Sequence, residues 1–284
     1  VGGKAVVLAT GGMGSNPELI AKYSWFAPSA YNMNTLTPLQ NMGDGLMMAL
    51  SAGADDTNIV TCPILAAGAR DKAMDSHIGA AGVQPGAIWI NKTGRRFANE
   101  GTAENIGDIG PLYGKQPDGI VWSVLDQANI DRLAENGSEI SIGEFVVFGR
   151  PLDRLRMELD QDVADGVAFA ANTPEELAEK IGVSPENFAA TVAAYNEACA
   201  AGDDKEFFKQ EKYLRPLSIP PFYAVALATG TMGSAGGIRI NGNMQVVDKD
   251  YEPIPGLYAV GLDATGLYGD SYNMEVPGAA NGFA

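Results

Sequence analysis

Apolar residues along this chain fall into short β-type runs and longer stretches with helical spacing. The first run, Lys4-Ala5-Val6-Val7-Leu8-Ala9-Thr10, is rich in Val and stops at Gly11 and Gly12, which predicts a buried strand ending in a tight turn. Further strands are predicted at 86–91, 120–126 and 256–261, and a hairpin over 238–247 turns at Asn241-Gly242.

Two helices are predicted near the N-terminus. Asn16 or Ser15 can cap a helix that has Pro17 at its first position. Gly43-Asp44-Gly45 opens a second helix, which stops at Gly53.

The middle of the chain carries stronger helix signals. Thr173 followed by Glu176 three residues later is a capping box, and a long helix is predicted from Ser184 to about Ala201. Its apolar residues at helical spacing are expected in the core, namely Phe188, Val192 and Tyr195.

This order of elements predicts a two-part organisation. Two glycine-rich segments that end in strands, 1–61 and 226–284, flank a mixed α+β insertion at 62–225. Distant segments that complete one lobe are common in nucleotide-binding enzymes. We therefore expect the outer segments to share one lobe and the insertion to form a separate domain.

Charge and composition narrow the function classes. The chain has 35 Asp and Glu against 19 Lys and Arg, a formal net charge of -16, which argues against a nucleic-acid partner because phosphates need a basic face. His77 is the only histidine and is expected on the surface or in a loop, so a metal site built from several histidines is impossible. Cys62 and Cys199 form no CxxC motif, and no apolar run approaches the ~20 residues of a membrane span.

Several short glycine-containing motifs occur along the chain in a fixed order. They are Ala9-Thr10-Gly11-Gly12, Gly43-Asp44-Gly45, Gly94-Arg95-Arg96-Phe97-Ala98-Asn99-Glu100, Thr231-Met232-Gly233-Ser234-Ala235-Gly236-Gly237-Ile238 and Pro255-Gly256-Leu257-Tyr258-Ala259-Val260-Gly261. Together they resemble the succinate dehydrogenase/fumarate reductase flavoprotein superfamily, which includes fumarate reductase, urocanate reductase and 3-ketosteroid Δ1-dehydrogenase. The resemblance implies an α/β FAD-binding lobe, partial and three-layered here, with an inserted α+β capping domain that holds the substrate.

The resemblance also implies a cofactor, FAD. Glycine turns let backbone N–H groups approach its pyrophosphate and ring. Asp263 is a candidate for the flavin-ribityl contact, because Leu262 stands where relatives place a glutamate. The cofactor-binding residues implied are Gly11, Gly12, Gly43, Asp44, Gly45, Gly261, Asp263, Pro277, Gly278, Ala279 and Ala280. The superfamily's first GxGxxG motif is not in this sequence, so FAD binding by this chain alone is expected to be weak or absent.

The expected chemistry is reduction or desaturation of an activated carbon–carbon bond by hydride transfer at flavin N5. Glu104 falls where relatives place a proton-donating arginine or a catalytic tyrosine, and Tyr272 is the second candidate for proton transfer. A glutamate that donates near neutral pH needs a raised pKa, which burial could provide. The single histidine and the acidic Glu104 and Glu275 make fumarate an unexpected substrate, because a dicarboxylate would be repelled.

Other points stay open at this stage. Tyr113 and Tyr268 are either pocket residues or ordinary packing. A small-molecule substrate is expected, and a heme or iron–sulfur protein or domain is a possible electron donor. Cytoplasmic and cell-envelope locations are both compatible with the sequence. The alternative function is a non-catalytic binding module that keeps the flavoprotein fold.

Overall fold

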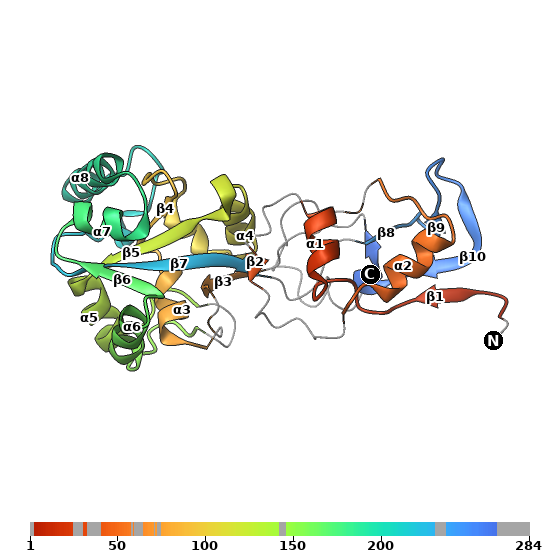
Figure 1. Cartoon of the computed structure of the whole chain (residues 1–284), viewed down its shortest axis with the longest axis horizontal. Coiled ribbons are helices and arrows are strands. Elements are labelled where there is room, and N and C mark those ends of the chain that lie inside the picture. The colour runs from red at the N-terminus through yellow and green to blue at the C-terminus, as the bar shows by residue number, and fades with distance from the viewer. Residues whose placement is uncertain are drawn as a thin grey trace.

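The computed structural model describes residues 3–24, 31–32, 41–57, 59, 65–70, 72, 75–141, 146–230 and 237–265. Its helices and strands form two bodies along the longest axis, one around strand β7 (Phe222–Gly230) and one around strand β10 (Pro253–Ala259) (Figure 1). The larger body comes mainly from the middle of the chain, and the smaller one combines its two outer segments.

A six-stranded sheet organises the larger body. Its path runs β2-β7-β5-β4, and two further strands, β3 and β6, also pair with β7. The strands other than β7 are β2 (Tyr31–Asn32), β3 (Leu65–Ala69), β4 (Ile88–Asn91), β5 (Val121–Asp126) and β6 (Ala168–Ala171). Among these pairings β2 is parallel to β7, whereas β3, β5 and β6 run antiparallel to it.

Both faces of this sheet are covered because its strands alternate apolar side chains between two cores. In β4, Trp89 belongs to one core and its neighbours Ile88 and Ile90 belong to the other, as the two-residue period of a strand requires. Helices α7 and α8 lie on one side of the sheet and α3, α5 and α6 on the other (Figure 1). The α-helices of this body are α3 (His77–Gly82), α4 (Ile106–Gly114), α5 (Gln127–Asn136), α6 (Leu155–Ala164), α7 (Pro174–Ile181) and α8 (Pro185–Ala201).

The predicted helix caps are confirmed. Thr173 accepts a hydrogen bond from Glu176 N at 3.1 Å, while the Glu176 carboxylate accepts one from Asn172 N, one residue before the cap, and not from Thr173 N as a full capping box requires. Ser184 caps α8, and the predicted core residues on that helix, Phe188, Val192 and Tyr195, are buried. Short 3-10 turns complete this body at η2 (Glu100–Glu104), η3 (Pro117–Gly119) and η4 (Glu211–Tyr213).

The smaller body joins the two ends of the described chain. Strand β1 (Val6–Leu8) runs parallel to β10, with Val7 opposite Tyr258, and β10 pairs on its other side with β9 (Gln245–Val247). Strand β8 (Ile238–Arg239) pairs with β11 (Ala264–Thr265). Helices α1 (Pro17–Tyr23), capped by Asn16, and α2 (Asp44–Ser51) belong to this body, as does the 3-10 turn η5 (Gly261–Asp263).

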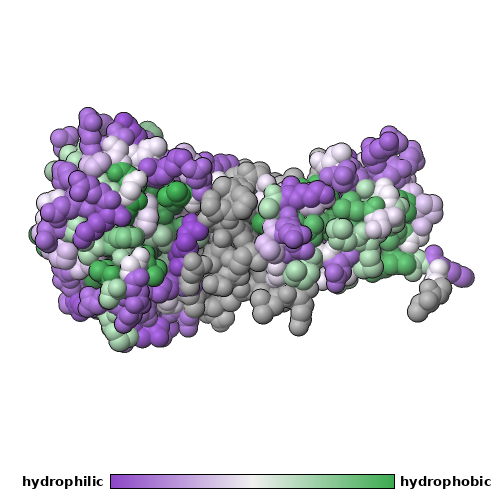
Figure 2. All heavy atoms as spheres, viewed as in Figure 1, coloured by the Kyte–Doolittle hydropathy of each residue, from purple (hydrophilic) through white to green (hydrophobic). Residues whose placement is uncertain are grey.

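The prediction that the first strand is buried is wrong for most of its length. Val6 and Val7 are 53% and 58% exposed, and only Leu8 reaches the core. Among the described strands, β1 lies at the edge of its sheet, in the order β1-β10-β9, so no described strand flanks it on the other side. Hydrophobic residues therefore appear on the surface of this body (Figure 2).

The histidine prediction also needs correction. His77 is buried at the start of α3, where its Nδ1 accepts a hydrogen bond from Arg154 N at 3.0 Å. Ser76 caps the helix, and the hydrogen bond from Arg154 N holds the ring beside the segment that begins α6.

The predicted domain limits stay a prediction. Strand β7 continues from residue 222 to residue 230, so it crosses the expected boundary at residue 226. In the described part of the chain, no helix is both long and apolar enough to cross a membrane.

Candidate functional site

The buried carboxylate of Asp263 joins the C-terminal part of the chain to the turn after β1. It accepts hydrogen bonds from Thr10 N, from the Thr10 hydroxyl at 3.0 Å and from Gly12 N at 3.0 Å. The backbone N–H groups of Thr10 and Gly12 are thereby satisfied inside the protein.

The first turn of α2 packs against the same junction. Gly45 N donates to the Thr10 hydroxyl at 3.0 Å, and a Cβ at Gly45 would lie 2.5 Å from that oxygen and 2.9 Å from Asp263 Oδ2. Gly43 N bonds to the Gly12 carbonyl at 3.0 Å. The Gly-Asp-Gly motif therefore has glycine at position 45 because two other loops approach its backbone closely.

Backbone conformation explains other glycines of the motifs. Gly11, Gly12, Gly43 and Gly261 all have positive φ, a region that residues with a Cβ rarely adopt. No atom lies within 4 Å of the position that a Cβ would take at Gly261, so the backbone there faces open space.

These features fit an anionic dinucleotide such as FAD. Gly43, the residue before α2, has no side chain that could cap the helix. The positive end of the α2 dipole therefore lies beside the glycine turns. Asp44 is exposed in the first turn of α2, where it can accept a hydrogen bond from a ligand. Gly261, with no atom within 4 Å of its Cβ position, would offer bare backbone to the cofactor, whereas a Cβ at Gly11 would lie 3.0 Å from Asn41 Oδ1 and Gly12 is buried.

The structure thus brings together the expected cofactor residues that it describes, from three separate parts of the sequence: Gly11, Gly12, Gly43, Asp44, Gly45, Gly261 and Asp263. Pro277, Gly278, Ala279 and Ala280 lie outside the described residues, as do Tyr268, Tyr272 and Glu275. Sequence reasoning did not single out Thr10, whose hydroxyl both donates to Asp263 and accepts from Gly45. Its position directly before the glycine pair was the available signal.

Glu104, the first candidate for proton transfer, ends η2 in the larger body. Its carboxylate pairs with Lys212 Nζ at 2.8 Å and accepts a hydrogen bond from the Tyr213 hydroxyl. The hydrogen bonds from Lys212 and Tyr213 hold the pKa of Glu104 below its usual value, and 46% of its side chain is exposed. This arrangement favours an ionised carboxylate and does not supply the raised pKa that a proton donor needs near neutral pH.

A buried ionic cluster anchors the start of η2. Arg96 forms a two-point pair with the Glu100 carboxylate, at 2.9 Å and 2.7 Å, and also contacts Asp204 at 2.9 Å. Lys209 lies 3.3 Å from Glu100, and despite burial these cations hold the pKa of Glu100 below its usual value. Glu100 also accepts a hydrogen bond from Trp89 N, which ties η2 to strand β4.

The same two segments therefore meet at two ion pairs. Glu100 and Glu104 lie on η2, and their partners Lys209 and Lys212 lie three residues apart on the facing segment. The first pair is fully buried and the second is exposed, so η2 is fixed at its base while Glu104 faces solvent.

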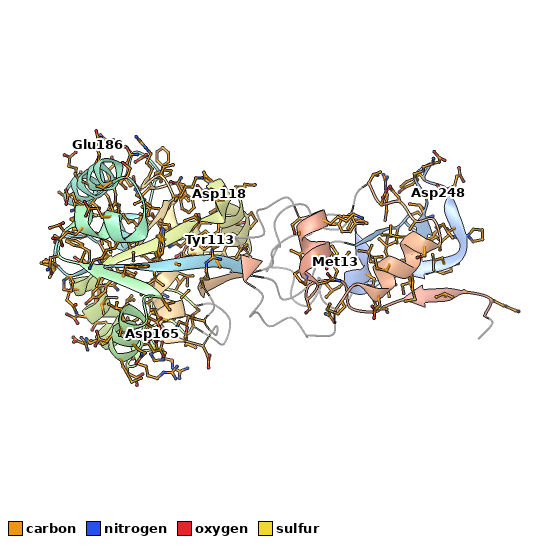
Figure 3. All side chains as sticks on the ribbon, in the orientation of Figure 1. Met13, Tyr113, Asp118, Asp165, Glu186 and Asp248 are labelled. Carbon is orange, nitrogen blue, oxygen red and sulfur yellow. The ribbon has the colours of Figure 1, made fainter. Side chains whose placement is uncertain are left out.

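Tyr113 is a core residue. Its ring makes an edge contact with Trp89, the centroids being 5.2 Å apart, and burial raises its pKa. It lies inside the larger body, whereas Met13 lies in the smaller one (Figure 3). The described residues contain no cluster of His, Cys, Asp and Glu that could hold a metal ion.

Comparison with known proteins agrees with a site that binds FAD. A family model described as an FAD binding domain matches residues 1–277. The chain is 34% identical to the vinyl phenol reductase of Lactiplantibacillus plantarum, over 99% of this chain and 58% of that protein. It is 31% identical to a protein of Shewanella frigidimarina named probable fumarate reductase Ifc3, over 95% of this chain and 40% of that protein.

A solved structure shares the fold. The 3-ketosteroid Δ1-dehydrogenase of Sterolibacterium denitrificans superposes with a TM-score of 0.69 at 22% identity, over 95% of this chain and 49% of that one. The chain thus spans about half the length of the relatives that it matches.

Proposed function

Because the chain belongs to the FAD binding domain family, within the succinate dehydrogenase/fumarate reductase flavoprotein superfamily, we propose that the whole protein reduces or desaturates an activated carbon–carbon bond. The observation that carries this proposal is the junction at Asp263, where three glycine-containing loops distant in sequence meet around Thr10. The open space at the Cβ position of Gly261, beside this junction, supports a bound cofactor there.

Bound FAD supplies hydride chemistry at its N5 atom. The residues of this chain hold the cofactor and handle the proton. Asp263 and Thr10 fix the turn after β1, and the N-terminus of α2 beside this turn would stabilise negative charge on a bound cofactor.

Glu104 is the proposed proton-transfer residue, with Tyr272 as the second candidate. As an ionised carboxylate, Glu104 is suited to accept a proton, which is the task of desaturation. To donate a proton in the reductive direction it must first be protonated, which the hydrogen bonds from Lys212 and Tyr213 oppose.

The proposed substrate is an activated alkene other than fumarate. Clamping a dicarboxylate would need cations, whereas Glu104 carries negative charge and the ring of His77 is held by Arg154 N in the larger body. A relative named vinyl phenol reductase supports an alkene conjugated to an aromatic ring.

The decisive experiment uses the full-length protein with its flavin reduced under anaerobic conditions. Reoxidation by vinyl phenol, enones, enoates and fumarate is followed by absorbance. The proposal expects fast reoxidation by at least one activated alkene and little by fumarate. In the Glu104→Gln variant, substrate turnover should fall by about 10²- to 10⁴-fold while flavin binding and reduction by an artificial donor stay normal.

Two results would contradict the proposal at different levels. Full-length protein that does not retain FAD would support the alternative, a binding module that keeps only the fold. Full turnover in Glu104→Gln with a true substrate would remove Glu104 and leave Tyr272 or water as the proton source. A Tyr272→Phe variant then separates those two.

A further inference from the structure

Two donors hold the carboxylate of Glu104, and they differ in how firmly they are fixed. Tyr213 is 5% exposed and belongs to the hydrophobic core that also contains Ala103, the residue before Glu104. The side chain of Lys212, in contrast, is 60% exposed. The Tyr213 hydroxyl is therefore the donor with a fixed position, because close packing of its ring leaves it little freedom.

Both donors bind the same oxygen of the carboxylate. Lys212 Nζ donates to Glu104 Oε1 at 2.8 Å, and the Tyr213 hydroxyl donates to that oxygen as well. Among the described residues, no donor reaches Glu104 Oε2. Because 46% of the Glu104 side chain is exposed, the carboxylate has one oxygen tethered to the protein and one that can meet another molecule.

The contact between Tyr213 and Glu104 keeps its polarity at neutral pH. Burial of the ring and the hydrogen bond to Glu104 raise the pKa of the Tyr213 hydroxyl above its usual value, so it stays protonated. The hydrogen bonds from Lys212 and Tyr213 lower the pKa of Glu104, so it stays ionised. A neutral phenol that donates to a carboxylate forms a charge-assisted hydrogen bond, which is stronger than one between neutral groups.

The two short turns that carry these residues are held against each other. Glu100, at the start of η2, and Lys209, two residues before η4, form a fully buried ion pair at 3.3 Å. Tyr213 ends η4, and its backbone N–H donates to the Gln210 carbonyl at 2.8 Å. The position of the Tyr213 hydroxyl relative to η2 is therefore set by the fold.

We propose that Tyr213 is a positioning residue for Glu104, which holds Oε1 and thereby directs Oε2 toward the substrate carbon that exchanges the proton. This inference rests on the proposed function of Glu104. In desaturation, the substrate C–H bond breaks and its proton bonds to Oε2. The electron pair of that bond forms the new carbon–carbon double bond as hydride leaves the neighbouring carbon for the flavin. Tyr213 keeps its own proton throughout.

The test uses the full-length protein with its FAD reduced under anaerobic conditions and mixed with vinyl phenol, enones, enoates or fumarate. In Tyr213→Phe, which keeps the ring that packs in the core, the maximal rate with the fastest oxidant should fall at least about tenfold. KM should stay within about twofold, because the substrate still binds and only the carboxylate is misaligned. The limb of the pH profile that reports Glu104 should also move to higher pH, since the ionised carboxylate loses a donor.

Tyr223→Phe is the matched control. It removes a tyrosine hydroxyl from the same core, one that donates to Gln127 Oε1 at 2.8 Å and not to Glu104. The maximal rate and the pH profile of this variant should match those of the parent protein. Thermal unfolding of both variants measures how much each change affects stability.

Glu104→Gln, measured alongside, separates failure of this inference from failure of the proposed function. A large loss of turnover in Glu104→Gln together with an unchanged rate and pH profile in Tyr213→Phe would overturn this inference alone. Equal losses in Tyr213→Phe and Tyr223→Phe would also overturn it, because a general effect on the core would then explain both. Full turnover in Glu104→Gln would refute the proposed function of Glu104, and the role of Tyr213 would fall with it.

Discussion

Asp263 and Thr10 are 253 positions apart in the sequence, yet the Asp263 carboxylate accepts hydrogen bonds from both the backbone and the hydroxyl of Thr10. This contact closes the smaller body across its two chain segments. It also fixes the geometry of the turn that carries Gly11 and Gly12.

Replacing Asp263 by Ala should destabilise the smaller body strongly. The change leaves Thr10 N, the Thr10 hydroxyl and Gly12 N without their acceptor, and we expect a loss of about 2–4 kcal/mol in the free energy of unfolding. Urea unfolding followed by circular dichroism measures the loss. Asp250→Ala, at an exposed turn position, should change stability by less than about 0.5 kcal/mol. Equal stabilities of the two variants would mean that the hydrogen bonds to Asp263 do not stabilise the fold.

Gly45→Ala should destabilise the chain even though the residue lies in a helix. Alanine ordinarily stabilises a helix by up to about 1 kcal/mol relative to glycine. Here the new Cβ would lie 2.5 Å from the Thr10 hydroxyl oxygen, and relieving such a clash costs about 1–3 kcal/mol, so the clash dominates. Gly242→Ala is the control, because no atom lies within 4 Å of its Cβ position. A thermal midpoint for Gly45→Ala at or above that of the parent chain would contradict the geometry.

The loss of stability at acid pH should depend on Asp55. Hydrogen bonds from Thr57, together with Arg239, lower the pKa of Asp55 from 3.8 to about 2. A carboxylate with a depressed pKa contributes stability above its unfolded-state pKa and loses it as the pH falls through the folded-state value. The contribution should therefore disappear between about pH 4 and pH 2. Asp55→Asn should make the free energy of unfolding depend less on pH between about pH 4 and pH 2. Asp56→Asn, at the exposed neighbouring position, should leave that pH dependence unchanged.

The Glu104–Lys212 pair predicts a shift in a pH profile. Lys212 helps to hold the pKa of Glu104 below its usual value, so Lys212→Met should raise that pKa. If Glu104 transfers the proton, the limb of the turnover profile that reports Glu104 should move to higher pH in the full-length enzyme. Lys205→Met, which changes the same residue type at an exposed position, serves as the control. An unmoved profile in Lys212→Met would show that Glu104 does not titrate in the rate-determining step.

Loading with FAD can be measured directly on this chain. The first GxGxxG motif of the superfamily is not in the sequence, so no stoichiometric binding is expected after mixing with FAD and gel filtration. The absorbance of the protein peak in the flavin bands gives the molar ratio of FAD to protein. Tight one-to-one binding would show that the loops around Asp263 suffice to hold the cofactor.

Local signals explain what the sequence predicted well. Helix caps such as Thr173 and Ser184 act over three residues, and the apolar run in β4 spans four, so both could be recognised without knowledge of the fold. The glycine motifs could be assigned to one site because their order resembles that of a known superfamily.

The missed features depend on long-range contacts. The exposure of Val7 follows from the position of β1 at a sheet edge, and the burial of His77 follows from the approach of Arg154. The lowered pKa of Glu104 depends on Lys212, which is 108 positions away. No local pattern encodes which side chain will meet another across such a separation.

Strand β7 has a consequence for the order of folding. In the described sheet, β2, β3, β5 and β6 all pair with β7, and every one of them precedes it in the chain. During synthesis from the N-terminus, these strands must wait for residues 222–230 to emerge, and among the described strands of this sheet only β4 and β5 can pair earlier. Pairing of such high sequence separation is slow, and the waiting strand edges are open to misassembly. A ribosome-bound chain that ends before Phe222 should therefore be far more sensitive to protease than one that extends past Gly230 by the length of the exit tunnel.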